Sequence, residues 1–79
     1  MGSVDLVEKT ARIVNYCKTS RRKVQIMTEM SLNDLEAEAY TTILIRQGLL
    51  EKNVKEYQTT IQGNSYLDTM DRVRSVLRR

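Results

Sequence analysis

The sequence predicts a mainly α-helical domain that contains one small β-hairpin and ends in a long helix. An apolar pattern at helical spacing follows Asn33 and stops at Gly48. Two short segments of strand type come directly after that glycine, and a last apolar pattern runs from Tyr66 to Leu77. The chain contains no proline that would interrupt these elements.

Length and composition predict one domain, over residues 4–79, with residues 60–79 as its long final helix. The chain has 79 residues and a 41% hydrophobic content, which suffices for a modest core. One cysteine excludes an internal disulfide, and the absence of histidine excludes histidine-based zinc sites and histidine acid–base catalysis. No membrane-spanning run or leader segment is visible, so we expect a cytoplasmic protein.

Net charge favours a polyanionic partner without establishing one. The formal charge is +3 and the pI is near 9.2. The cations concentrate in the first thirty and the last nineteen residues, whereas the middle helix is net acidic.

Two helices are expected before the middle one. The first covers Val4 to about Thr19, and its apolar side places Cys17 in the core. The second covers about 21–30 with Ser20 as its cap, and its inward residues are predicted to be Val24, Ile26, Met27 and Met30.

Three consecutive cations, Arg21, Arg22 and Lys23, fall at the predicted start of the second helix. Cations are unfavourable at the positive end of a helix dipole. They are interpreted either as a solvated turn or as a group that meets phosphate together with the free N–H groups of that turn.

The middle helix is predicted over residues 33–47. Asn33 and Glu36 have the spacing of a capping box, and Gly48 supplies the left-handed stop. The short Ser31-Leu32 connection to the preceding helix predicts a helix-turn-helix unit. The inward side is predicted to be Ala37, Tyr40, Thr41, Leu44 and Ile45, and the other face Asp34, Leu35, Glu38, Ala39, Thr42 and Arg46.

The segments 49–53 and 56–59 predict a hairpin, with Asn53 as the residue suited to a positive φ. Lys52 and Lys55 would project near its tip. Thr60 is the expected cap of the last helix, whose apolar seam is Tyr66, Met70, Val73 and Leu77. The first half of this seam is expected to pack on the chain's own core, and the second half on the same helix of a second copy, which predicts a homodimer.

Catalytic and metal-binding chemistry is not supported. No nucleophile lies in a glycine-rich or elbow context, and Asp34, Glu36 and Glu38 are spaced so that they splay around their helix. We therefore expect no enzyme activity, no cofactor and no metal.

Several segments resemble a family of small archaeal winged-helix proteins, which are predicted transcriptional regulators with a dimerising final helix. Residues 48–52 (GLLEK) and 57–67 (YQTTIQGNSYL) are similar to that family's GLI…Y.LT..G..YL signature, and residues 12–14 and 32–33 match its upstream motifs. The resemblance implies a winged helix-turn-helix fold with three helices, a two-stranded wing at 52–57 and a long C-terminal helix. It also implies a homodimer that binds double-stranded DNA, with residues 34–47 as the recognition helix.

Two functions follow as hypotheses. In the first, the protein is a homodimeric transcriptional regulator or architectural protein. Its expected DNA contacts are Arg21, Arg22, Lys23, Asn33, Thr42 and Arg46 from the helices and Lys52 and Lys55 from the wing; Tyr66, Met70, Val73 and Leu77 dimerise. In the second, the acidic and partly apolar face around Leu35 and Ala39 docks a protein, because carboxylates on a recognition helix repel phosphate.

Overall fold

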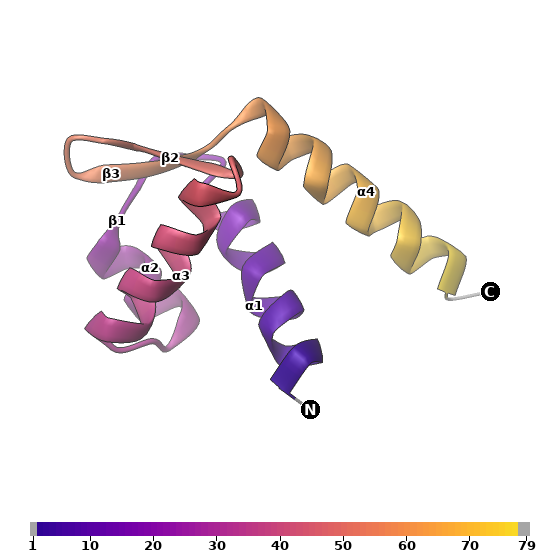
Figure 1. Cartoon of the computed structure of the whole chain (residues 1–79), viewed down its shortest axis with the longest axis horizontal. Helices are drawn as coiled ribbons and strands as arrows, with labels where there is room; N and C mark the ends of the chain where they lie inside the picture. Colours follow the sequence, from indigo (N-terminus) through magenta and orange to yellow (C-terminus); the bar gives the residue numbers. More distant parts are fainter. Residues whose placement is uncertain (1, 78–79) are drawn as a thin grey trace.

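The computed structural model describes residues 2–77, and the side chains from Val7 onward. The elements follow in the order α1 (Gly2–Tyr16), β1 (Arg21–Arg22), α2 (Lys23–Met30), α3 (Asp34–Arg46), β2 (Leu50–Asn53), β3 (Glu56–Thr59) and α4 (Ile61–Leu77). In Figure 1, α2, α3 and the hairpin lie at one end, and α4 extends away from them. The predicted mainly helical architecture is confirmed. Arg78 and Arg79, the end of the predicted final helix, lie outside the described residues.

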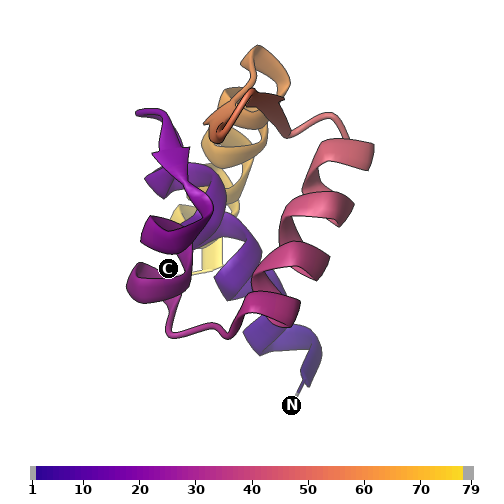
Figure 2. The same ribbon diagram turned by 90° about the vertical axis from the view of Figure 1, so that its left-hand side faces the viewer.

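The helix-turn-helix unit forms as its capping residues predict. The Asn33 side chain accepts a hydrogen bond from the Glu36 N–H at 2.7 Å, and the Glu36 carboxylate accepts one from the Asn33 N–H at 3.0 Å. Ser31 ends α2 with a left-handed φ of 55°, and Gly48 has a φ of 77° after α3. The left-handed Ser31 and the Asn33 cap lie between α2 and α3 and set the sharp angle between these helices (Figure 2).

The sheet has three strands where the sequence predicted two. Its order is β1-β3-β2, and both pairings are antiparallel. Arg21 pairs with Tyr57 and Arg22 with Glu56, so these two arginines are extended and α2 starts only at Lys23. The prediction of Ser20 as the helix cap was therefore wrong; Arg22 is the N-cap residue, and the Gln25 side chain accepts from its backbone N–H at 2.8 Å.

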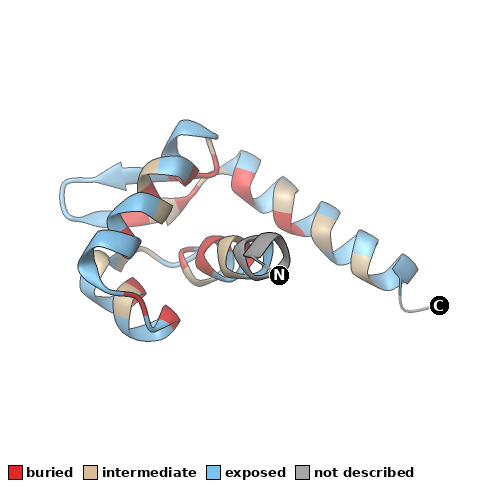
Figure 3. Cartoon of the chain, turned by 60° about the horizontal axis from the view of Figure 1, so that its bottom comes forward, coloured by how far each residue is buried: buried red, intermediate tan, exposed pale blue. Residues whose placement is uncertain are grey.

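The core lies between α1, α2, α3 and the inner face of the sheet. Ile13, Val14, Cys17, Ile26 and Ala37 are fully buried there. Figure 3 shows the buried residues on the facing sides of these elements and the exposed residues on the outer sides. The predicted inward position of Val24 was wrong: its side chain is 65% exposed, because α2 turns Ile26 and Met30 inward instead.

Three further predictions need correction. Ile45 was predicted to face inward on α3, but its side chain is exposed. The residue with positive φ in the hairpin turn is Val54, at 53°, and not Asn53. The first helix ends at Tyr16 instead of Thr19, because residues 17–19 turn toward β1.

The start of α4 is fixed against the sheet, whereas its end is not. The Thr60 hydroxyl accepts from the Gly63 N–H at 3.0 Å, as predicted for a cap, and Gly63 and Leu67 are buried. Tyr66 packs against the core. Beyond Met70, the apolar side chains of Val73, Val76 and Leu77 are exposed, the last by 78%. None of the helices within residues 2–77 is long and apolar enough to cross a membrane.

Candidate nucleic-acid interface

Lys23, the first residue of α2, contacts the acidic side of α3. Its Nζ lies 2.8 Å from the Asp34 carboxylate and 2.8 Å from the Glu38 carboxylate. The hydrogen bonds to Asp34 and then Glu38 raise the pKa of the Lys23 ammonium. One cation thus partly neutralises two of the three carboxylates on α3, and the third, Glu36, is held by the capping box.

The acidic residues do not occupy the most outward side of α3. Ala37, Thr41 and Leu44 are buried, so the opposite side of the helix carries the residues at i, i+4, i+7 and i+11. We call these the outward stripe: Leu35, Ala39, Thr42 and Arg46. Leu35 is 79% exposed. The outward stripe contains no carboxylate and ends in a cation.

Arg21 makes its contacts within the protein itself. Its Nε donates to the Tyr16 carbonyl at 3.1 Å, and its guanidinium lies 4.1 Å from the centre of the Tyr16 ring. The side chain is half-buried and ties the end of α1 to β1. Its predicted role as a DNA contact competes with these contacts.

Arg22 lies beside the tip of the hairpin. It shares a shallow hollow with Asn53, Val54, Lys55 and Glu56. Its side chain is exposed, and among the described residues no carboxylate lies within ion-pair distance of it. The structure therefore brings Arg22 and Lys55 together, from segments more than thirty residues apart in the sequence.

The other predicted contacts differ in their availability. Lys52 is exposed and lies opposite Tyr57 in the hairpin, with its Nζ 5.6 Å from the centre of the Tyr57 ring. Asn33 uses its side-chain oxygen as the helix cap. Thr42 is half-buried and Arg46 is exposed, both on the outward stripe.

Figures 1 and 2 show how the elements that carry these residues are arranged. The hairpin, α2 and α3 lie on one side of the molecule, and α4 lies behind them in the second view. Arg22, Arg46 and Lys55 belong to elements on that side. The arrangement offers a helix with a carboxylate-free outward stripe next to a hairpin that carries cations at its tip.

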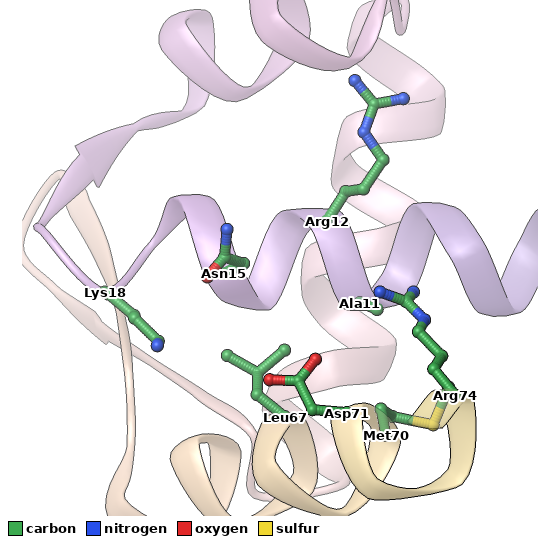
Figure 4. Close-up of a pocket in the computed structure, with 8 residues that line it drawn as sticks. All are labelled: Ala11, Arg12, Asn15, Lys18, Leu67, Met70, Asp71 and Arg74. Carbon is green, nitrogen blue, oxygen red and sulfur yellow. The ribbon is translucent and has the colours of Figure 1, made fainter. Parts of the chain in front are cut away.

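A second group of charged residues lies away from this side. Arg12 and Lys18, on and just after α1, line a groove with Asp71 and Arg74 of α4 (Figure 4). Arg12 points away from α4, and the Arg74 guanidinium lies 3.4 Å from the Glu8 carboxylate. Sequence reasoning did not place these residues together, because they come from opposite ends of the chain.

Sequence reasoning also missed the contact of Lys23 with Asp34 and Glu38. Residues eleven and fifteen apart on two helices have no local spacing signal. Only the angle of the helix-turn-helix unit brings them together. Leu35 and Ala39 were assigned solely to a protein-docking face, although they are the first two residues of the outward stripe.

Cys17 does not lie at this surface. Its side chain is fully buried, as predicted, and burial raises the pKa of its thiol to about 11. A protonated, enclosed thiol is unreactive, which agrees with a role in packing.

Comparison with protein families gives one result. The family model described as "Winged helix-turn-helix" matches residues 5–78, which is nearly the whole chain. The search of curated proteins found no match.

Proposed function

The chain belongs to the winged helix-turn-helix family, and on that basis we propose that it binds double-stranded DNA as a transcriptional regulator or an architectural protein. In this proposal α3 enters the major groove and the β2–β3 hairpin, the wing, lies beside the backbone. The chain then acts by binding and not by catalysis.

The contact of Lys23 with Asp34 and Glu38 carries the proposal. Uncompensated carboxylates on a recognition helix would repel phosphate and oppose the counterion release that drives DNA binding. Here a cation of the preceding helix holds two of them at 2.8 Å each. The groove can therefore receive Leu35, Ala39 and Thr42, while Arg22, Arg46 and Lys55 are available for phosphates.

A salt titration of binding to a random-sequence 30-base-pair duplex tests this proposal. We expect micromolar binding at low salt and a steep fall of log K with log salt concentration. The double variant Arg22→Ala/Lys55→Ala should bind more weakly and lower that slope by about 2, because each lost phosphate contact lowers it by about 1.

The matched control is Arg12→Ala/Lys18→Ala, which removes the same number of positive charges from exposed positions on and just after α1. Its salt slope should stay near that of the unmodified protein. Absence of binding at low salt, or equal slopes for both double variants, would contradict the proposed interface.

A protein-docking function is the alternative, and the exposure of Leu35 and of Val24 favours it. Both are large apolar side chains on the helix-turn-helix unit, and such patches occur at interfaces. Failure to bind duplex DNA at any salt concentration would make this alternative the better explanation.

We further propose that two copies associate through α4. Val73, Val76 and Leu77 form an apolar patch near the end of α4 that the rest of the described chain leaves exposed. The same helix of a second copy is the simplest cover for it, whereas Tyr66 and Met70 are half-buried against the chain's own α1 and α3.

Sedimentation equilibrium tests the association. The variant Leu77→Asp should sediment as a monomer at concentrations at which the unmodified protein is a dimer, since it places a charge in the contact. Ile61→Asp, at an exposed position at the other end of α4, is the matched control and should remain dimeric. If the unmodified protein is a monomer at all concentrations tested, the proposed association is refuted.

A further inference from the structure

The hydrogen-bonding side chains at the start of α3 lie off the outward stripe. In the capping box the Asn33 side-chain oxygen and the Glu36 carboxylate each accept a backbone N–H. Asp34 and Glu38 face Lys23. The side chains left on the outward stripe in these turns are those of Leu35 and Ala39, which are apolar.

We infer that this protein recognises thymine methyl groups in the major groove through the apolar part of the outward stripe. The inference rests on the proposed DNA-binding function and specifies what the recognition helix reads. The C5-methyl of thymine is the only apolar group that the four standard bases present in that groove. Leu35 and Ala39 carry no hydrogen-bonding group, so this part of the stripe discriminates bases by contact with the methyl group.

The spacing of the stripe suits successive base pairs. Leu35, Ala39 and Thr42 span seven residues, or about 10 Å along the helix axis, which corresponds to roughly three base-pair steps of about 3.4 Å. Leu35 is in the first turn, the part of a recognition helix that contacts base edges. Thr42, which is half-buried, follows Ala39 on the same stripe.

Charge complementarity supports duplex DNA as the occupant of this surface. Arg46 ends the outward stripe near the base of the wing (Figure 1), and Arg22 and Lys55 lie at the wing tip. A docked protein would satisfy the apolar side chains equally well, but it would need acidic groups at each of these cations. The DNA backbone supplies such groups on both sides of every groove.

Replacement of thymine by deoxyuridine tests the inference, because it removes the methyl group and keeps the pairing edges. The probe is one mixed-sequence 30-base-pair duplex in which every thymine is replaced. Burial of one methyl group contributes about 0.8 kcal/mol, which is about fourfold in affinity. For one or two contacts we expect roughly four- to fifteenfold weaker binding of the deoxyuridine duplex. A third duplex, which keeps its thymines and has 5-methylcytosine in place of cytosine, should bind more tightly than the unmodified duplex.

Leu35→Ala separates a contact from a change in DNA shape. This variant should bind thymine and deoxyuridine duplexes with a clearly smaller difference in affinity, since the longest apolar side chain is gone. Ile61→Ala is the matched control, because Ile61 is an exposed apolar residue at the start of α4, and it should retain the full difference. Thermal unfolding should be unchanged in both variants, as each side chain is largely exposed.

The outcomes are distinguishable from those of the DNA-binding test. Equal affinity for thymine and deoxyuridine duplexes overturns the inference and leaves DNA binding intact. A full difference in Leu35→Ala also overturns it, since DNA stiffness would then be the cause. Absence of binding to all three duplexes overturns the proposed function itself and favours a protein partner.

Discussion

Two regions of the molecule use their residues in opposite ways. At the junction of α1, β3 and α4, buried groups without charge make close contacts: the Thr59 hydroxyl donates to the Val14 carbonyl, and the Thr59 N–H donates to the Cys17 carbonyl at 2.9 Å. At the surface formed by α2, α3 and the wing, the contacts are ion pairs between exposed side chains, and several cations have no partner among the described residues. The junction positions the elements, and the surface is free to meet a ligand.

Because the junction and the surface use different contacts, stability and DNA binding should be separable by mutation. Substitutions at the junction are expected to change the free energy of unfolding and leave the salt slope of DNA binding unchanged. Substitutions of the charged side chains at the surface should do the reverse, because exposed ion pairs contribute little to stability. Each prediction below tests this separation.

The largest effect is expected for Gly63→Ala. A Cβ at this position would lie 2.4 Å from the Leu49 carbonyl oxygen and 2.6 Å from the Thr59 Cγ2, so the backbone of α4 has to move away from the sheet. We expect a loss of about 3 kcal/mol in the free energy of unfolding, measured by urea denaturation. Ser65→Ala, an exposed neighbour on the same helix, should change it by less than about 0.5 kcal/mol. Equal stability of the two variants would show that the approach of α4 to the sheet is loose.

Cys17 makes stability depend on pH in the alkaline range. Its pKa is raised from 9.0 to about 11 by burial, so between these values the unfolded chain releases this proton and the folded chain retains it. Stability is fully present below pH 9 and falls as the pH rises toward 11, by roughly 2–3 kcal/mol from this group alone. The measurement is the difference in urea unfolding between the unmodified protein and Cys17→Ala, which isolates the contribution of this thiol. A difference that does not change with pH would contradict the burial of the thiol.

The junction and the surface also differ in how far the sequence predicts them. The Asn33–Glu36 capping box, the Gly48 stop and the Thr60 cap are local signals, and each was confirmed. Strand β1 was missed, because two arginines become a strand only through pairing with β3, far along the chain. The same reason explains the site: Arg21, Arg22 and Lys23 look equivalent in sequence, yet one binds Tyr16, one lies at the wing tip and one faces Asp34 and Glu38.

Val54 tests whether the wing tip is strained. It is a β-branched residue with a φ of 53°, a conformation that costs such a side chain about 1–2 kcal/mol. Val54→Gly should relieve this cost and stabilise the fold by about 1 kcal/mol, after the greater flexibility of glycine in the unfolded chain is subtracted. Urea denaturation measures the gain, and Lys55→Gly, next to it without a positive φ, should show none. DNA affinity of Val54→Gly should be unchanged, because the cations of the tip remain.

The smallest effect, about threefold in DNA affinity, is expected for Lys23→Met, and its value lies in the salt dependence. If Lys23 acts by neutralising Asp34 and Glu38, its loss weakens binding through repulsion but removes no phosphate contact, so the salt slope stays the same. If instead Lys23 binds phosphate directly, as the run of three cations suggests from sequence alone, the slope falls by about 1. Asp34→Asn/Glu38→Gln should tighten binding under the first explanation, again without a change in slope. The two variants therefore decide whether the cation at the start of α2 belongs to the interface or only protects it from the acids of α3.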